Sequence, residues 1–250
     1  ALGFVPSYSM HPLIGKVAGV EWVEGARQSD FKLDLPSALV QIAELKPALT
    51  FITTPNNPTG SAVNLAEIAA LASATSKIKG LLVVDEAYAE FSTEPSAINL
   101  LSRYKNLIVS RTMSKAFAFA GVRLGYMAAA PEIISALQLV RLPYHLSTLT
   151  QAAAEVALEF SDELLAEVKK LSLDREKLSE KLIELGLNVI PSDANFILFG
   201  GFKQSSHELW EKLLAEGVLI RDVGLEGYLR VTIGNEAENQ AFLKALKGAL

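Results

Sequence analysis

The stretch GLLVVDEAY, residues 80–88, joins a run of four large aliphatic residues to a carboxylate and a tyrosine. A continuous apolar run without polar alternation predicts a strand that is covered on both faces, as in a parallel sheet. Similar runs flank it at 48–60, ALTFITTPNNPTG, and at 106–115, NLIVSRTMSK. The segments between these runs, NLAEIAALASATSK and EPSAINLLSRY, have the spacing of crossover helices. The first half is therefore predicted to be an α/β domain with a mostly parallel sheet.

The second half of the chain has a different pattern. Apolar residues recur at helical spacing from 147 to 186, which predicts a long helical connection that ends at Gly186. Four short runs typical of strands follow around one predicted helix, SSHELWEKLLAEG. These runs are LNVIPS, ANFILFG, GVLIRDV and YLRVTIG. We therefore expect residues 1–160 to form part of a large α/β domain and residues 161–250 a smaller C-terminal α+β domain.

Composition argues against several classes of protein. The 23 basic residues are scattered among 28 acidic ones, so no basic patch predicts binding to nucleic acid. Cysteine is absent and the three histidines are widely spaced, which argues against a metal site. The most apolar segment, AFAFAGVRLGYMAAA, is interrupted by Arg123 before it reaches the length of a membrane span, and the first residues lack the pattern of a signal peptide. We expect a globular, cytoplasmic protein with no membrane partner.

Polar residues follow the predicted strands at the carboxyl edge of the sheet, where ligands bind in α/β folds. Lys115 is a candidate amine for capturing a carbonyl group if burial or nearby positive charge lowers its pKa. Considered alone, a solvated lysine in the first turn of a helix is the favoured interpretation. Asp85 ends a buried strand and needs a cationic partner, for which a protonated pyridine nitrogen would serve. Tyr88 could donate to a ring hydroxyl or simply pack. Asn57 lies in a turn, PNNPTG, that is common for conformational reasons.

The stretch RTMSKAFAFAGVRLG, 111–125, adds groups suited to an anion. Thr112 and Ser114 supply hydroxyls, and AFAFAG predicts a helix whose first N–H groups suit a phosphate. The planar guanidinium group of Arg123 could donate two hydrogen bonds to the same phosphate. The alternative is a capped helix with a surface arginine. An aldehyde for Lys115, a pyridinium for Asp85 and this phosphate together describe pyridoxal phosphate.

The segments PNNPTG, VVDEAYAEF, SRTMSKAFAFAGVRLGY and YLRVTIG, in that order, resemble the fold-type I aminotransferases. SYSM, LVRLPYHLSTLTQAAA, PSDANFILF and LIRDVG extend the resemblance, more narrowly, to the histidinol-phosphate aminotransferases. The resemblance implies the fold of a fold-type I pyridoxal-phosphate-dependent transferase and a homodimer. It also implies a role in histidine biosynthesis, in which histidinol phosphate and 2-oxoglutarate give imidazole acetol phosphate and glutamate. Members of the family carry an arm, a helix and a loop before the SYSM segment, so we expect an upstream portion to be missing and this chain alone to bind the cofactor weakly.

The resemblance also implies a role for each matching residue. Lys115 would anchor the cofactor and move the substrate proton, Asp85 would keep the ring nitrogen protonated, and Tyr88 would act beside them. The other cofactor contacts, by stacking on the ring or by bonding its hydroxyl or phosphate, are Tyr8, Asn57, Thr112, Ser114 and Arg123. The substrate contacts are Asn57, Arg221 and Arg230, because two guanidinium groups can grip either a phosphate or a carboxylate.

Two alternatives remain open at this point. An aromatic amino acid aminotransferase of the same fold would have the same cofactor residues and would differ only in its substrate contacts. A non-catalytic α/β relative that kept the fold is the second alternative, and the presence of Lys115 and Asp85 argues against it.

Overall fold

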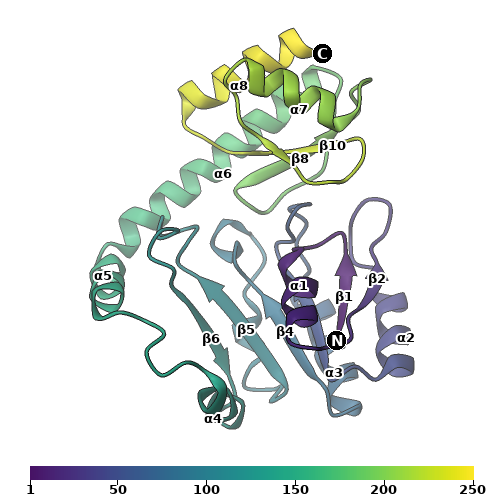
Figure 1. The fold of residues 1–250 in the computed structure, drawn as a ribbon, viewed down its shortest axis with the longest axis vertical. Helices are drawn as coiled ribbons and strands as arrows, with labels where there is room; N and C mark the ends of the chain where they lie inside the picture. Colours follow the sequence, from purple (N-terminus) through teal and green to yellow (C-terminus); the bar gives the residue numbers. More distant parts are fainter.

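The computed structural model describes residues 1–250 and contains two β-sheets joined by a long helix, α6 (Figure 1). The larger sheet has six strands in the order β2-β1-β3-β4-β5-β6. Its strands are β1 (Leu2–Val5), β2 (Val23–Ala26), β3 (Leu49–Thr53), β4 (Leu81–Asp85), β5 (Leu107–Thr112) and β6 (Gly125–Ala129). The three apolar runs of the first half are β3, β4 and β5, and they pair in parallel as predicted. Only β6 runs antiparallel to its neighbour, so the prediction of a mostly parallel sheet is confirmed.

Helices pack on the larger sheet and cover its apolar residues. They are α1 (Met10–Val17), α2 (Leu35–Leu45), α3 (Leu65–Lys77) and α4 (Pro131–Val140), with short 3₁₀ turns η1 (Ala89–Phe91) and η2 (Ala97–Leu100). The start of α3 is fixed by a capping box: the Asn64 side chain accepts from the N–H of Glu67, and the Glu67 carboxylate accepts from the N–H of Asn64.

The segment 94–104, predicted as a crossover helix, forms only the single turn η2, so that prediction was wrong.

The smaller sheet is antiparallel, with the strand order β7-β8-β10-β9. Its strands are β7 (Asn188–Val189), β8 (Phe196–Gly200), β9 (Arg221–Asp222) and β10 (Tyr228–Thr232). The helices beside this sheet are α6 (Ser161–Glu184), α7 (Ser206–Ala215) and α8 (Glu236–Ala249), whereas α5 (Thr148–Glu159) packs on the part of the molecule built around the large sheet. The single helix expected among these strands is α7, and α8 was not predicted. Its buried residues, including Phe242 and Leu246, pack into the same core as β8 and β10. The division into residues 1–160 and 161–250 stays a prediction.

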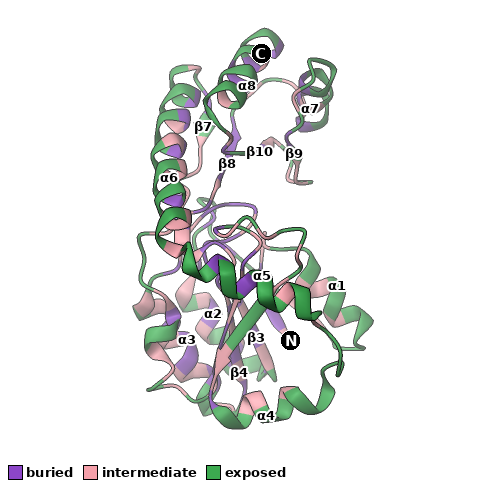
Figure 2. Cartoon of the chain, turned by 90° about the vertical axis from the view of Figure 1, so that its left-hand side faces the viewer, coloured by how far each residue is buried: buried purple, intermediate pink, exposed green.

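Three clusters of buried side chains hold these layers together. One cluster lies between the large sheet and helices α2 and α3. Another lies between the small sheet and helices α7 and α8. A third, smaller cluster joins the two sheets: Tyr88 and Phe91 follow β4, Val168 comes from α6, and Phe196 begins β8. Figure 2 shows α6 standing beside the junction, with buried residues along one side. The side chains that follow β4 are thus brought against the small sheet.

The segment after Lys115 does not form the predicted helix. It is a series of turns in which the Phe119 N–H donates to the Met113 carbonyl at 3.0 Å, and φ is positive at Ala118 and Arg123. Its two phenylalanines pack towards Met113 and helix α5. This tertiary packing outweighs the helix propensity of the alanines, and no helix start is available here to bind an anion.

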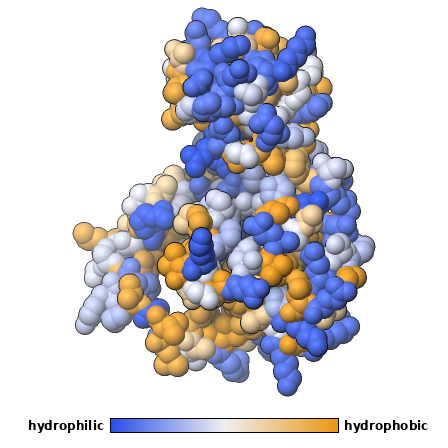
Figure 3. Space-filling view, turned by 45° about the vertical axis from the view of Figure 1, so that its right-hand side comes forward, coloured by the Kyte–Doolittle hydropathy of each residue, from blue (hydrophilic) through white to orange (hydrophobic).

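Exposed apolar side chains are concentrated on the part of the molecule built around the large sheet. Figure 3 shows orange patches there, whereas the part around the small sheet is largely blue on the same face. Most of the highly exposed large apolar residues lie in α1 and in the segment from the end of α4 to the start of α5: Val17, Leu139, Val140, Leu142, Tyr144 and Leu149. Leu219, just before β9, is as exposed as Leu142. None of the helices combines the length and the apolar character needed to cross a membrane.

Candidate active site

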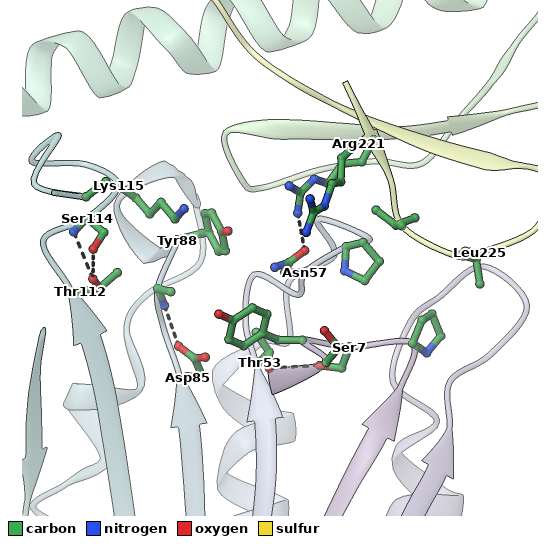
Figure 4. A pocket seen from close by; sticks show the side chains of 18 of the residues that line it. Ser7, Thr53, Asn57, Asp85, Tyr88, Thr112, Ser114, Lys115, Arg221 and Leu225 are labelled. Atoms are coloured by element: carbon green, nitrogen blue, oxygen red, sulfur yellow. Dashed lines mark hydrogen bonds between the residues drawn. The ribbon is translucent and has the colours of Figure 1, made fainter. Parts of the chain in front are cut away.

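A cavity of about 710 Å³ opens at the carboxyl edge of the large sheet and extends to the loops of the small sheet (Figure 4). In the parallel register Thr53 of β3 lies opposite Asp85 of β4, so the two strand ends reach the cavity together. All ten residues predicted to form the site line this one cavity. They are Tyr8, Asn57, Asp85, Tyr88, Thr112, Ser114, Lys115, Arg123, Arg221 and Arg230.

Lys115 follows the end of β5 and its side chain extends towards Tyr88 (Figure 4). Its Nζ lies 5.5 Å from the centre of the Tyr88 ring. Although much of the side chain is exposed, partial burial of the amine lowers its pKa, and the positive charges of Arg230 and Arg123 lower it further. A lowered pKa increases the fraction of free amine near neutral pH, as a nucleophilic lysine requires.

Asp85 is held at the end of β4 from two sides. One carboxylate oxygen, Oδ1, accepts from the Ala87 N–H at 3.1 Å, and Oδ2 lies 3.2 Å from Nε2 of His11. The His11 ring is in turn packed between Tyr8 and Phe51, with ring centres 5.3 and 5.2 Å away. Sequence reasoning missed His11, because its partner is far away in the sequence and a single histidine in SYSMHP has no local signature. Its ring fixes the orientation of the carboxylate that faces the cavity.

Tyr88 and Asn57 lie on the side of the cavity nearest the small sheet (Figure 4). Tyr88 is buried, and burial raises the pKa of its phenol. The negative charge of Asp85 raises this pKa further, whereas the positive charge of Arg230 lowers it without reversing the shift. The phenol therefore stays a hydrogen-bond donor at neutral pH. Asn57 Oδ1 accepts from a terminal nitrogen of Arg230 at 2.5 Å. The turn PNNPTG, which includes Asn57, is thus bonded directly to the small sheet.

The hydroxyl groups predicted to bind a phosphate form a small network beside Lys115. Thr112 Oγ1 donates to Ser114 Oγ at 2.9 Å and accepts from the Ser114 N–H at 3.1 Å (Figure 4). The exposed Arg123 donates to the Ala120 carbonyl at 2.9 Å and keeps further N–H groups available. These side chains present donors to an anion without the helix start that was expected.

Three further charged residues near the strand ends were not predicted, and one of them, Arg111, also lines the cavity. Arg111, in β5, contacts Glu86 through Nε and a terminal nitrogen, each at 2.9 Å, and contacts Glu90 at 2.8 Å. Glu86 is almost fully buried and also accepts from Ser96 and from the Ala97 N–H. Burial by itself would lower the pKa of the Arg111 guanidinium, but the two neighbouring carboxylates more than offset this and raise the pKa. This cluster links the segment that carries Asp85 to the strand that leads to Lys115.

Arg221 and Arg230 bring positive charge into the cavity from neighbouring strands of the small sheet, β9 and β10, where they are directly paired. Arg221 is exposed, whereas Arg230 is half-buried and its Nε has no hydrogen-bond partner. Burial lowers the pKa of Arg230, the phenol of Tyr88 opposes this, and Arg221 lowers it further. Two guanidinium groups with unused donors at one end of a cavity are chemically suited to bind a carboxylate or phosphate.

The sequence pattern of the family described as aminotransferase class I and II matches residues 1–246. The chain belongs to this aminotransferase family. Among its relatives, this aminotransferase chain is 56% identical over 245 residues to the histidinol-phosphate aminotransferase of Nocardia farcinica, covering 98% of this chain and 63% of that protein. It is 56% identical over 246 residues to the enzyme of the same name from Mycolicibacterium smegmatis, covering 98% of this chain and 64% of that protein. The chain thus spans a little under two thirds of the length of these curated relatives.

Solved structures of the family share the fold. The histidinol-phosphate aminotransferase from Clostridium acetobutylicum superposes with a TM-score of 0.92 at 28% identity, over 99% of this chain and 76% of that one. That from Sinorhizobium meliloti, in complex with pyridoxal-5′-phosphate, superposes with a TM-score of 0.91 at 27% identity, over 100% of this chain and 69% of that one. The fold predicted from the sequence, that of a fold-type I pyridoxal-phosphate-dependent transferase, is confirmed.

The donor set of the cavity fits the cofactor of such enzymes. A cavity of about 710 Å³ lies within the usual range for small-molecule sites. An amine, a carboxylate, a buried phenol and a group of hydroxyls with an arginine line the same space. These groups match, one for one, an aldehyde, a ring nitrogen, a ring hydroxyl and a phosphate, so the site could hold pyridoxal phosphate.

Proposed function

We propose that the protein containing this chain is a pyridoxal-phosphate-dependent histidinol-phosphate aminotransferase. The observation that carries the proposal is that ten side chains, predicted from separate sequence segments, line one cavity. The names of the relatives at 53–56% identity support the substrate assignment. In this reaction the amino group of histidinol phosphate passes to 2-oxoglutarate and gives imidazole acetol phosphate and glutamate.

Bound pyridoxal phosphate would supply an aldehyde that captures the amino group and a ring that accepts the electrons released from the substrate carbon. Lys115 would hold that aldehyde and then carry the proton to and from the substrate carbon. Its lowered pKa serves both roles, because only the free amine can accept a proton.

Asp85 would hold a proton on the ring nitrogen, since an ionised carboxylate favours a protonated partner. His11, at 3.2 Å from Asp85 Oδ2, keeps the carboxylate turned towards the cavity. Tyr88 and Asn57 would bond the ring hydroxyl, and Tyr8 would cover the ring face. Thr112, Ser114 and Arg123 would bind the phosphate.

Arg221 and Arg230 would bind the anionic group of each substrate in turn. Histidinol phosphate carries a phosphate and 2-oxoglutarate carries carboxylates, and the forked guanidinium pairs with either. A single anion site used by two substrates suits a reaction in which the first product leaves before the second substrate binds. We propose a homodimer and a cytoplasmic location, as the sequence resemblance predicts.

The experiment that tests the substrate assignment compares amino donors. Purified protein loaded with pyridoxal phosphate is assayed with histidinol phosphate, phenylalanine and tyrosine, each with 2-oxoglutarate as acceptor. The proposal predicts that kcat/KM for histidinol phosphate exceeds the other two values. A higher value for phenylalanine or tyrosine would favour the aromatic amino acid aminotransferase. A colourless protein that does not respond to pyridoxal phosphate would favour the non-catalytic relative.

A further inference from the structure

Two cations and two aromatic rings form a continuous column across the junction of the sheets. The Lys115 Nζ lies 5.5 Å from the centre of the Tyr88 ring. The Tyr88 ring meets the Phe196 ring edge to face, at 5.1 Å between centres and 90° between planes. The Arg230 guanidinium carbon lies 4.6 Å from the centre of the Phe196 ring. The column thus runs from the proposed cofactor anchor to the proposed substrate anchor.

Phe196 is the one member of this column that does not line the cavity. Its side chain is 1% exposed and belongs to the cluster that joins the two sheets. Its ring supports Arg230, whose Nε has no partner and whose hydrogen bond within the protein goes to Asn57. The guanidinium is therefore held by one amide oxygen and one aromatic ring.

We infer that Phe196 is a positioning residue that holds the Arg230 guanidinium in place and thereby keeps the site for the anionic group of the substrate ordered. The inference rests on the proposed function, in which Lys115 acts at the substrate carbon and Arg230 binds the anionic group of the substrate. A guanidinium over a ring is attracted by the negative face of the ring, and a partly buried cation gains more from this than an exposed one.

Phe196 also connects the Arg230 guanidinium to the large sheet. Its ring contacts Tyr88, which follows β4, while Arg230 lies on β10 of the small sheet. A shorter side chain at 196 would leave the guanidinium free to turn about its bond to Asn57. The anion site would then be less well ordered, although Lys115 and Asp85 would keep their places on the large sheet.

The test uses two matched variants of the same strand, Phe196→Leu and Phe199→Leu. Both rings are almost fully buried in β8, but Phe199 packs against Phe202 and Phe242 on the far side of the small sheet core. In the loaded enzyme, Phe196→Leu is expected to raise KM for 2-oxoglutarate about tenfold, the effect of losing one partly buried cation–ring contact, with kcat within about twofold. Phe199→Leu is expected to leave KM within about twofold of the wild type.

A second measurement does not depend on the cofactor. Calorimetric titration of the cofactor-free protein with glutarate, a dicarboxylate probe, is expected to give about tenfold weaker binding for Phe196→Leu and an unchanged Kd for Phe199→Leu. Equal effects of the two variants, or no glutarate binding by the wild type, would overturn the inference. Failure of the wild type to bind pyridoxal phosphate would instead overturn the proposed function, while the glutarate titration would still decide the role of Phe196.

A variant that conserves volume covers the case in which Phe196→Leu does not fold. Phe196→Met fills a similar space without a ring and is expected to weaken glutarate binding in the same way. Phe196→Tyr keeps the ring and is expected to restore affinity to within about threefold of the wild type. Wild-type affinity in the methionine variant would contradict the inference.

Discussion

Replacing Arg111 by methionine is expected to destabilise the protein strongly. Arg111 contacts Glu86 and Glu90 at 2.8–2.9 Å, and the side chains of these carboxylates are 2% and 10% exposed. Removing the guanidinium leaves two buried carboxylates without their cation. The loss of one partner from a buried ion pair costs about 3–5 kcal/mol, because the remaining charge stays desolvated.

This cost is large compared with the stability of a typical protein. A free energy of unfolding of about 5–15 kcal/mol would be reduced by about a fifth or more. For a chain of this length each kcal/mol lowers Tm by about 2–4 °C, so the expected fall in Tm is about 6–20 °C. The affected segment carries Asp85 and Tyr88, so cofactor binding is expected to weaken as well.

The matched control is Lys177→Met. Lys177 lies at the same N···O distance, 2.9 Å, from Asp174, but its side chain is 74% exposed. An exposed pair of this kind contributes about 0–1 kcal/mol. Thermal and urea unfolding followed by circular dichroism measure both variants. If Arg111→Met lost no more stability than Lys177→Met, the argument that burial decides the value of this ion pair would be refuted.

Three further predictions follow from the site and the turn beside it. Asp85→Asn should fold normally but lose most of its single-turnover rate, and a rate close to that of the wild type would defeat the assigned role. Burial lowers the pKa of Lys115, and the positive charges of Arg230 and Arg123 lower it further. Arg123→Gln should therefore raise this pKa and move the pH midpoint of Lys115 labelling by trinitrobenzenesulfonate, followed by peptide mass mapping, to higher pH. An unchanged or lower midpoint would contradict this. Gly60→Ala should destabilise the protein by about 1–3 kcal/mol more than Gly217→Ala, as measured by urea unfolding, and equal losses would refute the packing argument. Both glycines have positive φ, but a Cβ at Gly60 would meet the loop before β8, whereas nothing lies within 4 Å of one at Gly217.

The parallel core and the strand-end residues could be predicted because they depend on local sequence. Uninterrupted runs such as LLVV are stable only when both faces of a strand are covered, which fixes the parallel sheet and places Asp85 at its edge. Helix α6 was predictable from its helical spacing of apolar residues, which ends near Gly186, where φ is 81°.

The features that could not be predicted depend on contacts between distant segments. The turns after Lys115 form because two phenylalanines pack towards α5, and no local pattern reveals that partner. His11 meets Asp85, and Phe196 meets Tyr88, only once α1, β4 and β8 are in place. Short strands such as β1 and β2, with four residues each, carry too little periodicity to be recognised from sequence alone.

The most direct test of the central claim is to identify the lysine that pyridoxal phosphate modifies. The full-length protein that contains this chain is incubated with the cofactor, reduced with borohydride, digested and analysed by mass spectrometry, with a Lys115→Ala variant treated in parallel. The account predicts one cofactor adduct per chain, on the peptide that contains Lys115, and no adduct in the variant. An adduct on another lysine, or equal labelling of the variant, would contradict the assignment of this cavity as the cofactor site.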